Sequence, residues 1–142
     1  MTIRYEIIDH TADIGIKAKG VTLEELFTNA AYGMFDLMVL RPKKPDSAGV
    51  LHKNITINSV DKEHLLVKWL QELLYLFDRD GIIPLSYKFI SLNDTELGSN
   101  VEVYKIESET IQLKHQIKAV THHDIKIKKA DGLFEVTVIF DV

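Results

Sequence analysis

The chain has 142 residues, of which 46% are apolar and 27% are charged. This length fits one domain, and the apolar share is ordinary for a globular protein with a single core. Seventeen Lys and Arg against 21 Asp and Glu give a net charge of −4. Proteins held on a nucleic-acid backbone usually carry a basic excess, so tight direct binding to nucleic acid is disfavoured.

The composition also bears on the compartment. Cysteine is absent, which excludes disulfide bonds and thiolate chemistry. The N-terminal residues show no basic-then-apolar leader, and no apolar run approaches the roughly 20 residues needed to span a bilayer. We therefore expect a cytoplasmic protein without membrane association.

The first half of the chain predicts β-structure and two helices. β-rich runs at residues 4–8 and 14–19 indicate two strands or one interrupted strand around a polar break at 9–13. A helix then begins at Thr22, where Glu25 completes a capping box, and ends before the proline at position 42. A second amphipathic helix begins after Asp61 and ends near Gly81.

The remaining elements are predicted to be strands. Runs of period two place them at residues 50–58, 85–92, 101–106, 117–128 and 133–140. Asp131 and Gly132 indicate a hairpin between the last two, because both central positions of a type I′ turn need positive φ. The prediction is an α+β protein, a single domain over residues 1–142, in which a largely antiparallel or mixed β-sheet packs with two amphipathic helices and a C-terminal β-hairpin.

The register of this hairpin predicts a polar cluster. Counting outward from the turn places His122 opposite Asp141, beside the carboxylate of Val142. With Asp13 from the polar break, these groups would form an oxygen-rich cluster that suits a hard divalent ion such as magnesium, calcium or manganese. The alternative is that Asp13 caps a turn and Asp141 is a solvated residue.

Other chemistry has less support in the sequence. The six histidines are scattered, with no His-x-x-x-His pair on a helix, and His122 and His123 would face opposite ways in a strand. No serine sits in a Gly-x-Ser-x-Gly elbow, so a hydrolytic triad is not supported. Glu72 could serve acid–base chemistry, but no pattern places it beside a pocket, and Lys118 is a lone cation on a predicted strand.

Five short motifs occur in a specific order. They are DHTADI at 9–14, TLEE at 22–25, ELLY at 72–75, KAVT at 118–121 and DV at 141–142. In this order and spacing the chain resembles the archease family over essentially its whole length. One position departs from the family pattern KAxTYH, because His122 stands where tyrosine is expected.

The resemblance implies an accessory protein rather than a catalyst. Archeases serve an RNA ligase that joins 2′,3′-cyclic-phosphate or 3′-phosphate ends to 5′-hydroxyl ends, notably tRNA halves after intron removal. They promote guanylylation of the ligase and its repeated turnover. The expected partner is thus an RNA ligase, with RNA reached indirectly through it, and we expect a monomer or weak oligomer.

The resemblance also implies site residues. A divalent metal ion, calcium, magnesium or manganese, is expected on Asp13, Asp141 and a main-chain or terminal oxygen of Val142. Contact with the partner is expected at four further positions, Lys118, Glu72, His10 and His123. Two alternatives remain open: a small metal-dependent phosphoester hydrolase using the same carboxylates and His123, and a metal-free, chaperone-like binding module.

Overall fold

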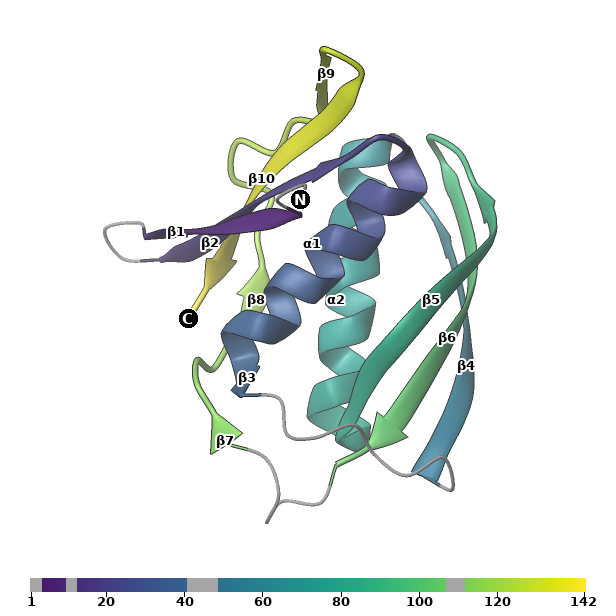
Figure 1. The fold of residues 1–142 in the computed structure, drawn as a ribbon, viewed down its shortest axis with the longest axis vertical. Coiled ribbons are helices and arrows are strands. Elements are labelled where there is room, and N and C mark those ends of the chain that lie inside the picture. The colour runs from purple at the N-terminus through teal and green to yellow at the C-terminus, as the bar shows by residue number, and fades with distance from the viewer. Residues whose placement is uncertain (1–3, 10–12, 41–48, 107–111) are drawn as a thin grey trace.

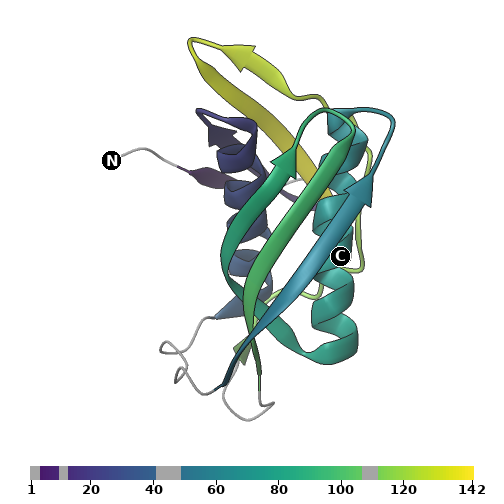
Figure 2. The same ribbon diagram turned by 90° about the vertical axis from the view of Figure 1, so that its right-hand side faces the viewer.

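Two helices lie between two antiparallel β-sheets (Figures 1 and 2). The computed structural model describes residues 4–9, 13–40, 49–106 and 112–142. Its elements are, in chain order, β1 Tyr5–Asp9, β2 Ile14–Gly20, α1 Leu23–Met38, β3 Val39–Leu40, β4 Val50–Asn58, α2 Lys62–Asp80, β5 Ile82–Leu92, β6 Glu96–Lys105, β7 Gln112–Leu113, β8 Ala119–Val120, β9 Lys128–Ala130 and β10 Leu133–Asp141. The predicted α+β class is confirmed.

The first sheet has the order β1-β2-β10-β8, and β9 also pairs with β10. Because β2 occupies one edge of β10, β8 and β9 share the other edge. The second sheet has the order β4-β6-β5, and a two-residue ladder joins β3 to β7. Strand β10 is therefore central, and it carries the last residues of the chain into the middle of the first sheet.

Both helices begin and end as the sequence predicts. The hydroxyl of Thr22 accepts a hydrogen bond from the backbone N–H of Glu25 at 3.1 Å, which caps α1. The carboxylate of Asp61 accepts one from the backbone N–H of His64 at 2.8 Å, which caps α2. Helix α2 ends where Gly81 adopts φ 64°, a left-handed conformation that glycine takes without strain.

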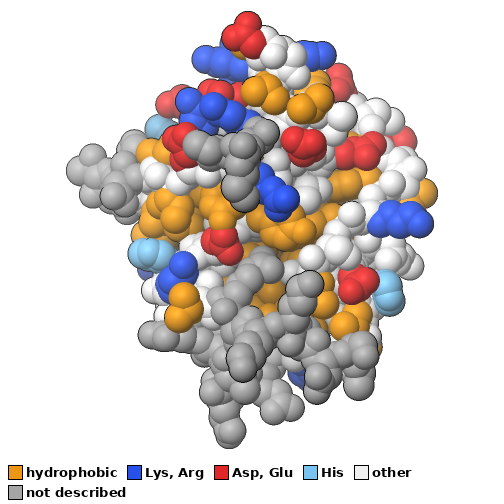
Figure 3. All heavy atoms as spheres, viewed as in Figure 1, with side chains coloured by type: hydrophobic (Ala, Val, Ile, Leu, Met, Phe, Trp, Pro, Cys, Tyr) orange, Lys and Arg blue, Asp and Glu red, His pale blue; other side chains and the backbone are white. Residues whose placement is uncertain are grey.

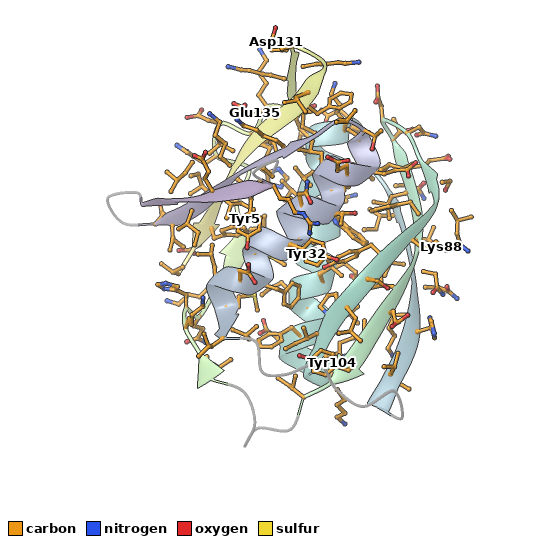
Figure 4. All side chains as sticks on the ribbon, in the orientation of Figure 1. Tyr5, Tyr32, Lys88, Tyr104, Asp131 and Glu135 are labelled. Atoms are coloured by element: carbon orange, nitrogen blue, oxygen red, sulfur yellow. The ribbon has the colours of Figure 1, made fainter. Side chains whose placement is uncertain are left out.

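One continuous apolar cluster lies between the helices and the two sheets. Trp69 of α2 is fully buried within it, and its indole N–H donates to the main-chain oxygen of Phe27 in α1 at 3.1 Å. The ring of Tyr32, on the α1 side facing β5, meets Tyr87 edge-on with ring centres 5.4 Å apart (Figure 4). These contacts fix the helices against each other and against the second sheet.

One predicted strand is wrong. Within residues 117–128 the chain pairs as a strand only at β8 and at the start of β9, and the segment 121–127 leaves the sheet. Asp124 has φ 48°, in a turn. The hairpin itself is confirmed, since Leu133 pairs with Ala130 across a turn of two positive-φ residues.

Strands β5 and β6 are longer than predicted. They begin three and five residues earlier than residues 85 and 101, since their bounds are Ile82–Leu92 and Glu96–Lys105. Ser99 lies in β6 although it is polar. Its side chain is buried, and its hydroxyl donates a hydrogen bond to the main-chain oxygen of Lys88 at 3.1 Å. A satisfied polar side chain can thus occupy an inward strand position.

The close approach of β2 to the first turn of α1 predicts a sensitive position. A Cβ on Gly20 would clash with the backbone nitrogen of Leu26 and lie 2.9 Å from the carbonyl carbon of Glu25. We expect Gly20→Ala to lower the free energy of unfolding by about 3 kcal/mol, because backbone on both sides must shift. The control is Gly49→Ala, where no atom lies within 4 Å. Urea denaturation that finds both variants equally stable would contradict this packing.

Candidate functional site

Asp13 and Asp141 each lie one residue beyond the last pair of the β2–β10 ladder. The last residue pair of the β2–β10 ladder is Ile14 with Phe140, so one further step places Asp13 opposite Asp141. Ile14 and Phe140 are buried on the helix side. Because side chains alternate along a strand, the two aspartates lie on the outer face of the sheet, the face that points away from the helices. We call Asp13 and Asp141 the acid pair.

The predicted pairing of His122 with Asp141 is wrong. Asp141 pairs with Ala119, three residues earlier in the chain than His122. The shift arises because the segment 121–127 bends away from β10 instead of continuing the hairpin ladder. A pocket of about 410 Å³ lies between this segment and the middle of β10, where the ladder is interrupted.

Hydrogen bonds of Thr121 fix the position of the chain directly after β8. The backbone N–H and the hydroxyl of Thr121 both donate to the main-chain oxygen of Ile139, at 3.0 and 2.8 Å. The same hydroxyl accepts a hydrogen bond from the backbone N–H of His123 at 3.3 Å. Thr121 therefore anchors the start of the bent segment to β10, two residues from Asp141.

Lys118 lies beside Asp141 in the sheet, but its side chain starts on the opposite face of the sheet. Its backbone N–H donates to the main-chain oxygen of Asp141 at 2.7 Å. One step beyond the pairing of Ala119 with Asp141, Lys118 comes opposite Val142. By strand alternation its exposed side chain starts on the helix side, whereas the acid pair lies on the outer face.

Glu72 lies on α2, the helix that packs against β8. The ring of His64 near the start of α2 meets the ring of His122 just after β8, and the two elements run in opposite directions (Figure 1). Glu72 lies eight residues further along α2, about 12 Å from His64 along the helix axis.

The structure describes one of the two predicted site histidines. His10 lies outside the described residues. His123 lies in the turn after β8 and not in a strand, and its Nε2 is 3.3 Å from the Oδ2 of Asp124. The expectation that His122 and His123 alternate across a strand is therefore wrong, since the segment that carries them has left the sheet.

The chemistry of the acid pair can be compared with the needs of a hard cation. Two carboxylates and an oxygen of Val142 are the type of donor that calcium, magnesium and manganese prefer. Their number is too small for calcium, which takes six to eight oxygens. Among the residues that the structure describes, no group of three or more His, Cys, Asp or Glu side chains is placed to hold a metal ion. The donors fit a hard ion chemically, and water or a partner would have to complete its coordination.

Charges of both signs gather on the outer face beyond the acid pair. Glu135 of β10 lies 3.0 Å from the ammonium of Lys17 and 3.7 Å from that of Lys19, both on β2. The hydrogen bond from Lys17 lowers the pKa of Glu135. Figure 4 places Glu135 along the β10 hairpin, and Figure 3 shows blue and red side chains intermixed over this end of the molecule. The arrangement gives no uniformly basic surface there.

Comparison with known proteins places this fold in a family. The model of the Archease protein family (MTH1598/TM1083) matches residues 5–142. The chain is 33% identical to the protein archease of Methanosarcina mazei, over 98% of this chain and 96% of that protein. It is also 33% identical to the protein archease of Sulfolobus acidocaldarius, over 98% and 99% of the two chains.

Two solved structures share the architecture. The solution structure of protein 1598 of Methanobacterium thermoautotrophicum superposes with a TM-score of 0.78 at 33% identity, covering 98% of this chain and 99% of that one. A crystal structure from Thermotoga maritima, described as an archease and possible chaperone, gives a TM-score of 0.64 at 20% identity, covering 100% and 99%, and shows the fold alone. The chain belongs to the archease family. In the described ranges, no helix is long and apolar enough to cross a membrane.

The anchoring role of Thr121 predicts a local effect. Thr121→Val removes the hydroxyl bond to Ile139, so we expect a loss of about 1 kcal/mol in unfolding free energy. We also expect faster hydrogen exchange at the backbone amide of Lys118, which bonds to Asp141. The control is Thr137→Val on β10, the same substitution away from β8. Equal exchange at Lys118 in both variants would show that Thr121 does not anchor the strand.

Proposed function

We propose that this protein is an accessory activator of an RNA ligase that joins 2′,3′-cyclic-phosphate or 3′-phosphate ends to 5′-hydroxyl ends, as in tRNA splicing. It would promote guanylylation of the ligase and multiple turnover without catalysing the joining itself. The observation that carries this proposal is that the chain belongs to the archease family. The pairing of Ile14 with Phe140, the neighbours of Asp13 and Asp141, supports it. RNA would be reached through the ligase, which agrees with the net charge of −4.

The acid pair is the proposed working end of the molecule. Asp13, Asp141 and an oxygen of Val142 would hold calcium, magnesium or manganese, which supplies positive charge for phosphate groups when bound. Asp141 and Val142 are exposed at the end of β10, so a partner can reach them. A ligand supplied by the partner would complete the coordination that the described residues leave partial.

Lys118 and Glu72 are the proposed contacts beside that end. Glu72 belongs to α2, which packs against β8, and Lys118 directly precedes β8 with an exposed side chain. A ligase that covers the chain end would meet the acid pair on one side of the sheet and Lys118 on the other. The two groups would then act on one partner from opposite sides of the same strand end.

Removal of the acid pair tests the proposal directly. We expect Asp13→Asn and Asp141→Asn each to abolish stimulation of a matching RNA ligase, measured as guanylylation and as ligation turnover. In calorimetry with calcium, magnesium and manganese, each variant should lose roughly 10- to 100-fold or more in affinity, because each removes a carboxylate ligand. The matched control is Asp131→Asn at the hairpin tip (Figure 4), where asparagine also accepts positive φ.

Three outcomes would count against the proposal. Unchanged ligase turnover with and without the wild-type protein would remove the activator role. Metal-dependent cleavage of generic phosphoesters by the isolated protein, lost in the same two variants, would favour the hydrolase alternative. Stimulation that persists in both variants and without metal would favour a metal-free binding module.

Lys118 is tested separately. We expect Lys118→Met to reduce stimulation of the ligase while metal affinity stays within about twofold, because the lysine lies across the sheet from the acid pair. The control is Lys88→Met, which removes a lysine at the far side of the second sheet (Figure 4). Equal stimulation by the two variants would exclude Lys118 from the partner contact.

A further inference from the structure

Two histidines that are distant in sequence meet at the start of α2. His64 lies in the first turn of that helix, and His122 lies in the segment that leaves β8. Their ring centres are 4.9 Å apart, with an angle of 37° between the ring planes. Both side chains are exposed, so water or a dissolved ion can reach them. We call His64 and His122 the histidine pair.

A carboxylate orients one ring of the histidine pair. The Oδ1 of Asp61 lies 2.7 Å from the Nδ1 of His64 and also accepts the backbone N–H of His64 at 2.8 Å. That backbone bond is the main reason why the pKa of Asp61 is lowered. Since an ionised carboxylate can only accept, Nδ1 of His64 carries the hydrogen, and Nε2 of the neutral ring keeps its lone pair.

This arrangement is typical of the residues behind a metal-binding histidine. A ligating histidine commonly donates its second N–H to a carboxylate, which fixes the tautomer and makes the free nitrogen more basic. Two imidazoles on one tetrahedral ion, each with its nitrogen at about 2.0–2.1 Å, have ring centres about 5 Å apart. The observed 4.9 Å matches that spacing.

We propose that His64 and His122 form a second metal site, for a transition-metal dication of the zinc class, with Asp61 as the residue that positions His64. Two imidazole nitrogens would bind the ion and water would fill the remaining positions. This site differs in chemistry from the acid pair, because imidazole suits zinc, copper and nickel whereas carboxylate oxygens suit calcium, magnesium and manganese. A bound ion would join the first turn of α2 to the segment after β8. The inference does not depend on the proposed role with a ligase.

The test is calorimetry with zinc alone on the whole chain. We expect one zinc per chain in the wild type, and at least a tenfold loss of affinity in His64→Ala and in His122→Tyr. The tyrosine keeps an aromatic ring against His64 but removes the nitrogen donor. Asp61→Asn should weaken binding roughly tenfold, because asparagine preserves the helix cap but not the charge.

Matched variants separate this site from others. His52→Ala removes an exposed histidine that bonds to Asn100 on the second sheet, and zinc affinity should be unchanged. Asp13→Asn with Asp141→Asn should also leave zinc affinity unchanged. The proposal fails if the wild type binds no zinc at millimolar concentration, if His122→Tyr binds zinc as tightly as the wild type, or if the loss appears only in the acid-pair variant.

A second readout separates lost binding from lost folding. Zinc should raise the melting temperature of the wild type and of His52→Ala, and leave that of His122→Tyr unchanged. Without zinc, the three proteins should have the same far-ultraviolet circular dichroism. An equal zinc-induced rise in the wild type and in His122→Tyr would overturn the histidine pair as the site.

Discussion

The pairing of β10 with β2 sets the position of every group at the proposed working end. Its register is fixed by burial, because Val136, Val138 and Phe140 are each at most 1% exposed and face the helices. Full burial of such side chains contributes about 1.5–3 kcal/mol each. A slip of one residue would turn this whole set outward and Asp141 inward, so the apolar face that stabilises the sheet also places the acid pair on the outer face.

The helices and the hairpin follow from local sequence, which explains why they could be predicted. Caps at Thr22 and Asp61, the left-handed Gly81 and the turn at Asp131 each involve residues close together in the chain. Neighbouring residues alone decide such features, whatever the rest of the fold. The grouping of Asp13 with Asp141 was predicted from a family resemblance and not from local sequence. The pairing of His122 with Asp141, which was predicted from the hairpin register, is wrong.

The segment 121–127 shows why that register failed. Its alternating apolar and basic residues have the period of a strand, and Ile127 is indeed buried. The backbone N–H of Ile127, however, donates to the carboxylate of Glu63 in α2 at 2.9 Å and not to β10. A side chain thus replaces a strand as the hydrogen-bond partner, and no pattern within the segment encodes that substitution. The meeting of His64 with His122 depends on the same departure.

Strand β8 connects the two proposed sites. Its ladder to β10 has two residue pairs, the shortest in the first sheet. The acid pair lies at one end of this ladder, where Ala119 pairs with Asp141, and the histidine pair follows its other end. An ion or partner that binds only when β8 is paired with β10 stabilises this pairing by mass action. Because the ladder is short and contributes little stability itself, the effect of such binding on the pairing should be large. Binding at one end of β8 should therefore favour the ordered state required at the other.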